Sequence, residues 1–165
     1  MNLTAKHLID TAYKEFSSHR IEQFTIMDLS RKSKVSRGSI YYHFECIDYL
    51  YKAILDQIIE KVTDGCNSSD DLLIGIVNYI AENKNLCLNL YYQNVITVRD
   101  GDIIKELNKL ILKYDKIDSS KKTERGYLIG VFLVIIRNWL DDNLSTDKDI
   151  IIKDLLNYNR LLKSI

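Results

Sequence analysis

The chain has 165 residues, of which 46% are hydrophobic, and its 23 Lys and Arg balance its 23 Asp and Glu to a formal net charge of +0. This length allows one sizeable core, or a small domain fused to a larger one. The neutral balance excludes a uniformly basic, histone-like DNA binder, but it allows a basic face on one part of the surface.

The charges are unevenly distributed along the chain. Residues 1–44 carry seven Lys and Arg against four Asp and Glu, a balance of +3, so the 16 basic and 19 acidic residues that remain give residues 45–165 a balance of −3. This asymmetry has the direction expected of a nucleic-acid-reading head on a larger, slightly acidic body.

The cysteines, the amino terminus and the longest apolar run bear on where the protein works. The cysteines stand at long spacings without a C-x-x-C pair, which predicts neither a metal site nor a disulfide framework: Cys46, Cys66 and Cys87. Lys6 and His7 interrupt the first apolar residues before the core of a signal peptide could form. The apolar run at residues 127–136 is far shorter than the ~20 residues of a membrane span. We expect a cytoplasmic protein without membrane segment, cofactor or metal.

The absence of proline and the recurrence of apolar residues every three or four positions predict an all-α fold. A first helix is expected to begin with Thr4 as its N-cap and to bury a stripe that ends at Phe16. A second begins at Thr25, and Asp28 has the spacing of a capping box. A third begins at Ser36, another N-cap candidate, and a longer fourth helix follows and ends at "DGCNSSDD".

Five more helices are predicted beyond that loop, near residues 70–83, 86–98, 102–116, 122–141 and 147–163. The segments "ENKN", "RDG", "DSSKK" and "DNLSTD" separate them. In the last segment, Asn143 suits the left-handed conformation that ends a helix, and Thr146 with Asp149 suits the start of the next. We expect a helix-turn-helix domain in residues 1–45 and a larger helical domain for ligand binding and dimerisation in residues 46–165.

The second and third helices, joined by "SKVS", have the proportions of a helix-turn-helix. The second helix of this motif enters the major groove of DNA, because a helix about 10–12 Å across fits a groove about 12 Å wide. Ser36 would direct its helix start at a phosphate, Arg37 could reach guanine or phosphate, and Ser39 could bond a base edge. Gly38 would allow close approach, and the surrounding positions are basic or aromatic: Arg31, Lys32, Lys34, Tyr41, Tyr42 and His43.

The stretch "FTIMDLSRKSKVSRGSIYYHFECIDYLYKAIL" resembles the DNA-binding head of the TetR family of bacterial transcriptional regulators. The matching residues are Thr25, Val35, Ser36, Gly38, Ser39, Tyr41 and Phe44. The resemblance implies a three-helix head followed by a helical regulatory body, with phosphate contacts from the helix starts at Thr25 and Ser36. It further implies base contacts from Arg37, Gly38 and Ser39, a clamp on the DNA backbone from Tyr41, Tyr42 and His43, and a core position for Phe44.

The sequence departs from the family's pattern in two places. Ser30, Ser33 and Lys34 stand where the family usually has alanines and a glycine, so the turn must form without glycine, which costs about 1 kcal/mol. Glu45 and Ile47 stand where a basic residue and a lysine would help to hold the DNA. The loss of one phosphate anchor predicts a salt dependence that is shallower by about one unit of slope.

The stretch "TERGYLIGVFLVIIRNWLDD" is apolar all round over residues 127–136, so both of its sides need cover. The core of its own domain would cover one side, through Leu128, Phe132, Ile135 and Trp139. A second copy is expected to cover the other side and the last helix, through Gly126, Gly130, Val134, Arg137, Ile151, Leu155 and Leu162. The resemblance implies the same dimer, and the alternative is a central helix within one large domain.

These patterns favour a dimeric repressor, not an enzyme, that binds a palindromic operator in double-stranded DNA and is released by a small hydrophobic or aromatic effector. The effector would lie among aromatic residues that could equally form the core: Tyr79, Tyr91, Tyr92, Tyr114, Phe132 and Trp139. The second hypothesis is a dimeric adapter or co-regulator that acts through a protein partner. An enzyme is disfavoured because the histidines are scattered and no nucleophile motif or phosphate loop is present.

Overall fold

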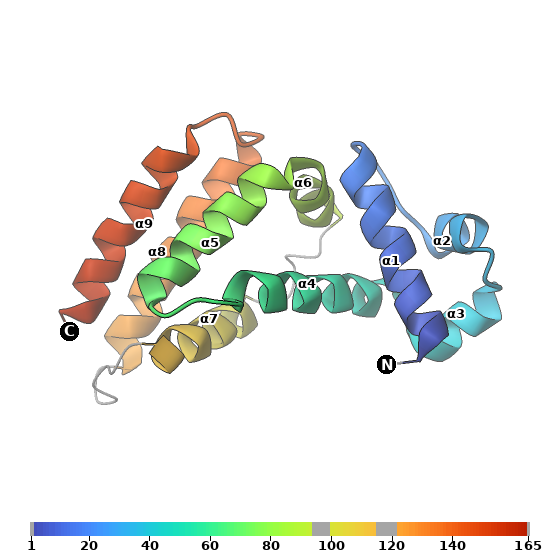
Figure 1. Cartoon of the computed structure of the whole chain (residues 1–165), viewed down its shortest axis with the longest axis horizontal. Helices are drawn as coiled ribbons and strands as arrows, with labels where there is room; N and C mark the ends of the chain where they lie inside the picture. Colours follow the sequence, from blue (N-terminus) through green and yellow to red (C-terminus); the bar gives the residue numbers. More distant parts are fainter. Residues whose placement is uncertain (1, 94–99, 115–121, 165) are drawn as a thin grey trace. The chain divides into compact units, whose positions relative to one another are not determined.

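The computed structural model describes residues 2–93, 100–114 and 122–164, and within these ranges the chain forms nine helices and no strand (Figure 1). The all-α prediction is therefore confirmed. The helices are α1 (Leu3–Ser18), α2 (Ile26–Ser33), α3 (Arg37–His43), α4 (Ile47–Thr63), α5 (Ser69–Glu82), α6 (Lys84–Tyr92), α7 (Asp100–Tyr114), α8 (Lys122–Asp141) and α9 (Lys148–Lys163). None of the helices in the described ranges combines the length and apolarity needed to cross a bilayer.

The first of two compact units, here called the head unit, comprises Met1–Lys61 and Asn83–Ile96 and so contains α6 in addition to the first helices of the chain. In it α1 packs against α2, α3 and α6. Its core contains an aromatic cluster: the Phe16 ring lies 5.1 Å from the Phe24 ring, edge to face, and 5.6 Å from the ring of Tyr51 on α4. The predicted boundary after residue 45 separates a DNA-binding domain from a domain for ligand binding and dimerisation. This functional division stays a prediction.

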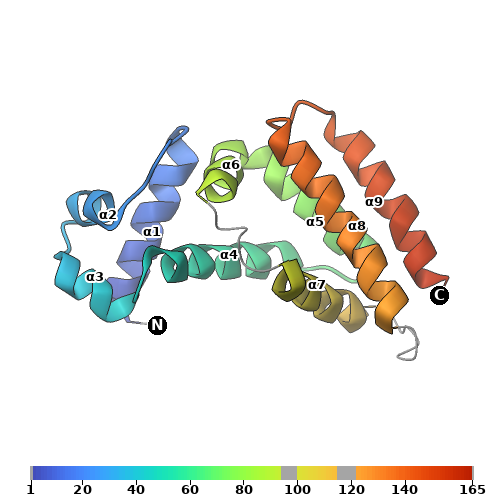
Figure 2. The ribbon, with the colours of Figure 1, turned by 180° about the vertical axis from the view of Figure 1, so that it is seen from behind.

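The second unit, here called the body unit, comprises Val62–Glu82 and Thr97–Ile165. Helix α9 packs against both α5 and α8, and α7 packs against α5 and α8 (Figure 2). The buried side chains come from all four helices and include Leu72, Val77, Ile111, Phe132 and Leu155. A polar contact also joins α9 to the start of α5, where buried Asn159 donates to the Ser69 hydroxyl at 2.7 Å.

The predicted helices are present, with two corrections at their starts. The N-cap of α1 is Asn2, not Thr4, because the Asn2 side chain accepts a hydrogen bond from the backbone N–H of Thr4 at 2.8 Å. The N-cap of α9 is Asp147, not Thr146, because its carboxylate accepts from the backbone N–H two residues later at 2.7 Å. Asn143 does take the left-handed conformation, with φ of 51°. The predicted end of the helix at 86–98 and the break "DSSKK" reach beyond the described residues.

The predicted core side of α8 is confirmed for Phe132 and Trp139, which are buried. Leu128 and Ile135 are only half-buried, and Ile129 and Leu140 are buried in addition to the predicted residues. Burial of the Trp139 indole requires a partner for its N–H, and this group donates to the backbone oxygen of Thr146 at 2.8 Å. The contact closes the turn between α8 and α9.

Candidate nucleic-acid interface

Helix α2 begins in the capping box that the sequence predicts. The Thr25 hydroxyl accepts from the backbone N–H of Asp28 at 3.2 Å, and the Asp28 carboxylate accepts from the backbone N–H of Thr25 at 3.0 Å. The hydrogen bond from the Thr25 hydroxyl is the main cause that holds the pKa of Asp28 below its ordinary value, and Arg31 and Lys32 lower that pKa further. The start of α2 is thus fixed by reciprocal bonds before any DNA is present.

The turn between α2 and α3 forms without glycine. Lys34 takes the left-handed conformation, with φ of 63°, which is the strained position that the sequence indicates. Neighbouring side chains satisfy the turn: Ser30 donates to the Val35 carbonyl at 2.7 Å, and the Ser33 hydroxyl accepts from the Val35 N–H at 3.2 Å. A ring nitrogen of His7 on α1 lies 2.9 Å from the Ser33 carbonyl oxygen. These bonds offset the strain of a left-handed lysine.

Helix α3 has one buried side and one exposed side. Ser36 is its N-cap and accepts from the backbone N–H of Ser39 at 3.2 Å. Ile40 and Phe44 are buried at 0% and 7% exposure, so the predicted core position of Phe44 is confirmed. The residues predicted to meet DNA lie on the other side: Arg37, Gly38, Tyr41 and Tyr42 are exposed, and Ser39 and His43 are partly exposed.

The space beside Gly38 is open, because an added Cβ atom would meet nothing within 4 Å. Packing within the chain therefore does not require glycine at this position. The open space is compatible with the predicted close approach of another molecule at Gly38, which stays a prediction.

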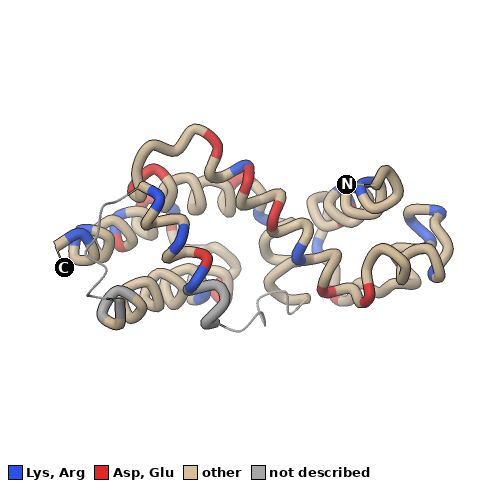
Figure 3. Tube along the Cα trace, turned by 90° about the horizontal axis from the view of Figure 1, so that it is seen from below, with Lys and Arg blue, Asp and Glu red and all other residues tan. Residues whose placement is uncertain are grey.

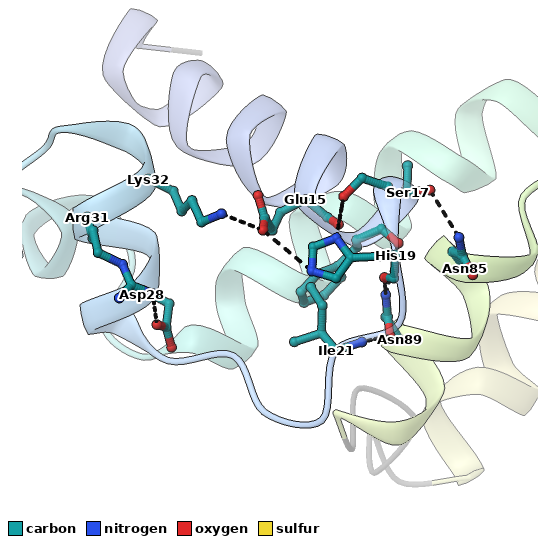
Figure 4. Close-up of polar contacts among 11 residues, drawn as sticks. Glu15, Ser17, His19, Ile21, Asp28, Arg31, Lys32, Asn85 and Asn89 are labelled. Carbon is teal, nitrogen blue, oxygen red and sulfur yellow. Dashed lines mark hydrogen bonds and ion pairs between the residues drawn. The ribbon is translucent and has the colours of Figure 1, made fainter.

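The basic residues around this surface fall into two groups. Arg31 pairs with Asp28 and Lys32 pairs with Glu15, each at 2.7 Å (Figure 4). Lys34 and Arg37 have no acidic partner within ion-pair distance among the described residues. The Lys and Arg positions gather where α2 passes into α3 (Figure 3). Lys34 and Arg37 are thus available for an anion from outside the chain.

A surface hollow adjoins the end of α3 and extends this face towards α4. Its lining joins predicted DNA-contact residues to others that the sequence analysis did not select: Tyr41, Tyr42, His43, Phe44, Glu45, Tyr49, Lys52, Ala53 and Asp56. Lys52 lies 3.4 Å from Asp56, one turn further along α4. The Tyr49 side chain is 53% exposed, and through it α4 contributes to the hollow. The periodicity of apolar residues in the sequence does not reveal this exposure.

The predicted effector-pocket residues are divided between the two units. Tyr91 and Tyr92 belong to the head unit, where the Arg20 guanidinium lies 5.0 Å from the centre of the Tyr92 ring. The others belong to the body unit: Tyr79, Tyr114, Phe132 and Trp139. Of these, Phe132 and Trp139 are buried, and the Tyr114 hydroxyl donates to the backbone oxygen of Thr63 at 3.4 Å. The six residues therefore do not form one site within a single unit.

The predicted dimer residues are exposed or half-buried on α8 and buried on α9, and the dimer interface stays a prediction. On α8, Val134 is 55% exposed, Arg137 is half-buried, and a Cβ atom added at Gly126 or Gly130 would meet nothing within 4 Å. On α9 the three named leucine and isoleucine side chains lie in the core of the single chain: Ile151, Leu155 and Leu162. They face α5 and α8, and the apolar residues that α9 exposes are Ile150, Tyr158 and Leu161.

Asn89 on α6 and Gln93, the C-cap that ends this helix, bind the backbone between α1 and α2 and were not identified from the sequence. Asn89 is fully buried, and its amide binds the end of α1 and the segment that follows it. Gln93 lies one turn later and binds the same segment. Two amides at i and i+4 in "NLYYQ" lie on one side of a helix, but this spacing does not reveal that they bind backbone groups.

Comparison with known proteins points to the amino-terminal part of the chain. Residues 8–54 match the family model described as bacterial regulatory proteins, tetR family. The chain is 40% identical over 92 residues to the probable acrEF/envCD operon repressor of Escherichia coli strain K12, and equally to that of strain O157:H7. Each alignment covers 48% of this chain and 41% of the relative, so the chain spans about two fifths of the length of the curated relatives that it matches.

A solved structure extends the likeness to the whole fold. The dihydroxyacetone kinase operon activator DhaS superposes with a TM-score of 0.66 over 99% of this chain and 98% of its own, at 14% sequence identity. At that identity the likeness concerns the fold alone. The family match begins within α1, includes the capped, exposed helix α3 and ends within α4. In this segment the chain is similar to bacterial regulatory proteins of the tetR family.

Proposed function

We propose that this chain is a transcriptional regulator that binds double-stranded DNA through α3. The observation that carries the proposal is the two-sidedness of that helix. Ile40 and Phe44 anchor it in the core, while Arg37, Gly38 and Tyr42 are exposed on a surface with open space and an unpaired cation. A helix held in this way fits the major groove, and its capped start is suited to a phosphate.

In this proposal the exposed residues have distinct tasks. Arg37 and Ser39 contact base edges or phosphates, and Gly38 allows the close approach of the helix to the DNA. The phosphate contacts come from the helix starts at Thr25 and Ser36, from the Lys34 ammonium, and from Tyr41, Tyr42 and His43. Exposed Glu45 opposes phosphate at the end of α3, so the binding should depend strongly on the two unpaired cations.

The protein acts as a homodimer in this proposal. Exposed Tyr127 and Val134 on α8, with Ile150, Tyr158 and Leu161 on α9, form apolar surface that a second copy would bury. The open space at Gly126 and Gly130 allows a second helix to approach α8 closely. Two heads held at a fixed separation would read a palindromic operator, as two-fold symmetry requires.

We further propose that the regulator is a repressor and that a small hydrophobic or aromatic effector releases it from DNA. The relatives that share 40% identity are named operon repressors, and this supports the sign of regulation. An effector site in the body unit would involve Tyr79, Tyr114, Phe132 and Trp139. Tyr91 and Tyr92 belong to the head unit and would respond to the effector there. Effector binding works in this scheme by favouring a different separation of the two heads.

A mobility-shift titration with the gene's own upstream region tests the proposal. We expect a shifted band at low salt that is competed by the unlabelled fragment better than by random DNA of equal length. The Arg37→Ala variant should bind both DNAs more weakly. Absence of any shift with that region and with randomised duplex libraries at low salt would reject DNA binding.

A second candidate is a dimeric adapter that acts through a protein partner. Exposed Glu45 and half-buried Ile47 stand where basic residues would help to hold DNA, and the whole chain has no net charge. Retention of a stoichiometric partner on the immobilised protein, unchanged by Arg37→Ala and by nuclease treatment, would favour this function over the first.

A further inference from the structure

The segment between α1 and α2, residues 19–25, is held by side chains from another part of the chain. Asn89 on α6 is fully buried and uses its whole amide on this region (Figure 4). Its Nδ2 donates to the backbone oxygens of Phe16 at 2.9 Å and His19 at 2.6 Å. Its Oδ1 accepts from the backbone N–H of Ile21 at 2.9 Å and from the guanidinium of Arg20 at 3.2 Å.

Gln93, the C-cap of α6 and one turn beyond Asn89, binds the same segment closer to the helix-turn-helix. Its Oε1 accepts from the backbone N–H of Phe24 at 3.1 Å. Its Nε2 donates to the backbone oxygens of Ile21 at 3.2 Å and Glu22 at 3.1 Å. The buried Tyr51 hydroxyl on α4 adds one more bond, to the Phe24 oxygen at 3.2 Å.

These bonds replace secondary structure that the segment lacks. Residues between two helices have no regular partners for their N–H and C=O groups, and leaving such groups buried without partners is costly. An amide side chain offers two N–H donors and an oxygen acceptor together, so an Asn and a Gln spaced one turn apart can bind several N–H and C=O groups of one backbone segment. The segment leads directly into Thr25, whose N–H and hydroxyl begin the capping box of α2.

We propose that Asn89 and Gln93 are positioning residues for DNA recognition: they hold residues 19–25 in place and thereby set the start of α2 and the turn into α3. This inference rests on the proposed DNA-binding function. Neither residue touches the exposed surface of α3, so each acts through the backbone of the segment that it binds. Helix α6 follows α5 after the single residue Asn83, so a displacement of α6 would reach the helix-turn-helix through these amides.

The test replaces Gln93 with methionine, which has similar volume but no amide. The matched control is Asn85→Ala, which removes another amide from the same helix that contacts the Ser17 carbonyl at 3.5 Å, outside the segment. Two quantities are measured on the full chain: backbone amide hydrogen exchange of peptides covering residues 19–33 and of peptides from α9, and the dissociation constant for duplex DNA under conditions where each variant is fully folded.

For Gln93→Met we expect exchange over residues 19–33 to rise about tenfold, from the loss of three hydrogen bonds, with α9 unchanged. The DNA dissociation constant should rise several-fold, whereas Asn85→Ala should leave both quantities near wild type. A residue that only stabilises the fold would shift the unfolding midpoint and leave the DNA affinity of the folded protein unchanged. That pattern, or unchanged exchange over residues 19–33, would overturn the proposal.

Two further measurements cover a Gln93→Met variant that does not fold and a wild-type protein that does not bind DNA. If Gln93→Met does not fold, Tyr51→Phe removes one hydrogen bond to the same segment with almost no change of volume, and we expect a smaller rise in exchange confined to residues 19–33. No change there would contradict the proposal. If wild-type protein binds no DNA, the proposed function fails, while the exchange measurement still decides whether these amides hold the segment.

Discussion

The head unit and the body unit are stabilised in different ways. In the head unit, polar side chains fix backbone: Asn89 and Gln93 hold the segment before α2, and Thr25 with Asp28 caps that helix. In the body unit, four helices pack mainly through aliphatic and aromatic side chains, and α8 and α9 keep apolar residues on the surface, such as Val134. The head unit therefore has a surface that is positioned within one chain, whereas the exposed apolar surface of the body unit is where we propose that a second copy binds.

The largest difference in stability between the two units should follow from Phe16→Ala. Phe16 is fully buried against Phe24 and Tyr51, and its truncation should destabilise the head unit by about 3–5 kcal/mol. Trp139 is the single tryptophan and lies in the body unit, so its fluorescence reports the body while helical circular dichroism reports both units. We expect urea unfolding of the variant to show an early transition in circular dichroism alone. Coincident, equally shifted transitions by both probes would show that the units unfold as one.

The next largest effect concerns the partner of the body unit. Val134→Asp places a carboxylate on the exposed apolar face of α8, and desolvating that charge should weaken a dimer by about 100-fold or more. Leu3→Asp is the matched control, because Leu3 is an 85% exposed apolar residue in the head unit. Sedimentation equilibrium should show dissociation of the first variant only. Equal dimerisation of both variants would show that the face of α8 around Val134 does not form the dimer interface.

A smaller effect tests the capping box of the head unit. Thr25→Ala should reduce the free energy of unfolding by about 1 kcal/mol, because α2 loses its N-cap. Since the pKa of Asp28 is lowered in the folded chain, the ionised carboxylate contributes stability above its ordinary pKa of 3.8, and this contribution is lost as the pH falls through the lowered value. Chemical unfolding should therefore separate wild type from Asp28→Asn at pH 7 and no longer do so once the pH is below that lowered value. A difference that persists in acid would contradict this account.

The smallest expected effect is at the strained turn. Lys34→Gly should raise the stability of the head unit by up to about 1 kcal/mol, because glycine takes the left-handed conformation without strain. The same change removes a cation and should reduce the salt slope of DNA binding by about one unit. Thermal unfolding and DNA titrations at several salt concentrations measure the two effects. A loss of stability would show that the Lys34 side chain supports the turn.

Local signals in the sequence predicted the head unit well. The spacing of Thr25 and Asp28, Ser36 before the short helix, and the position of Lys34 in the turn each depend on a few neighbouring residues, and each is confirmed. The N-cap of α1 was wrong by two positions, because asparagine at residue 2 competes with threonine at residue 4 for the same role.

Contacts between distant parts of the chain could not be predicted in the same way. An apolar stripe shows that Ile151, Leu155 and Leu162 are buried, but it does not tell whether α5 and α8 or a second copy buries them. The role of Asn89 depends on residues about 70 positions earlier, and a buried asparagine cannot be distinguished from an exposed one by spacing alone.

The proposed function requires direct contact between α3 and DNA phosphates or bases. The most direct measurement is the salt dependence of DNA affinity, by fluorescence anisotropy, for wild type, Arg37→Ala and Arg31→Ala. Arg37 has no acidic partner among the described residues, whereas Arg31 is paired with Asp28. We predict that Arg37→Ala weakens binding and reduces the slope by about one unit, and that Arg31→Ala has the smaller effect. Equal affinities and slopes for wild type and Arg37→Ala would contradict the account.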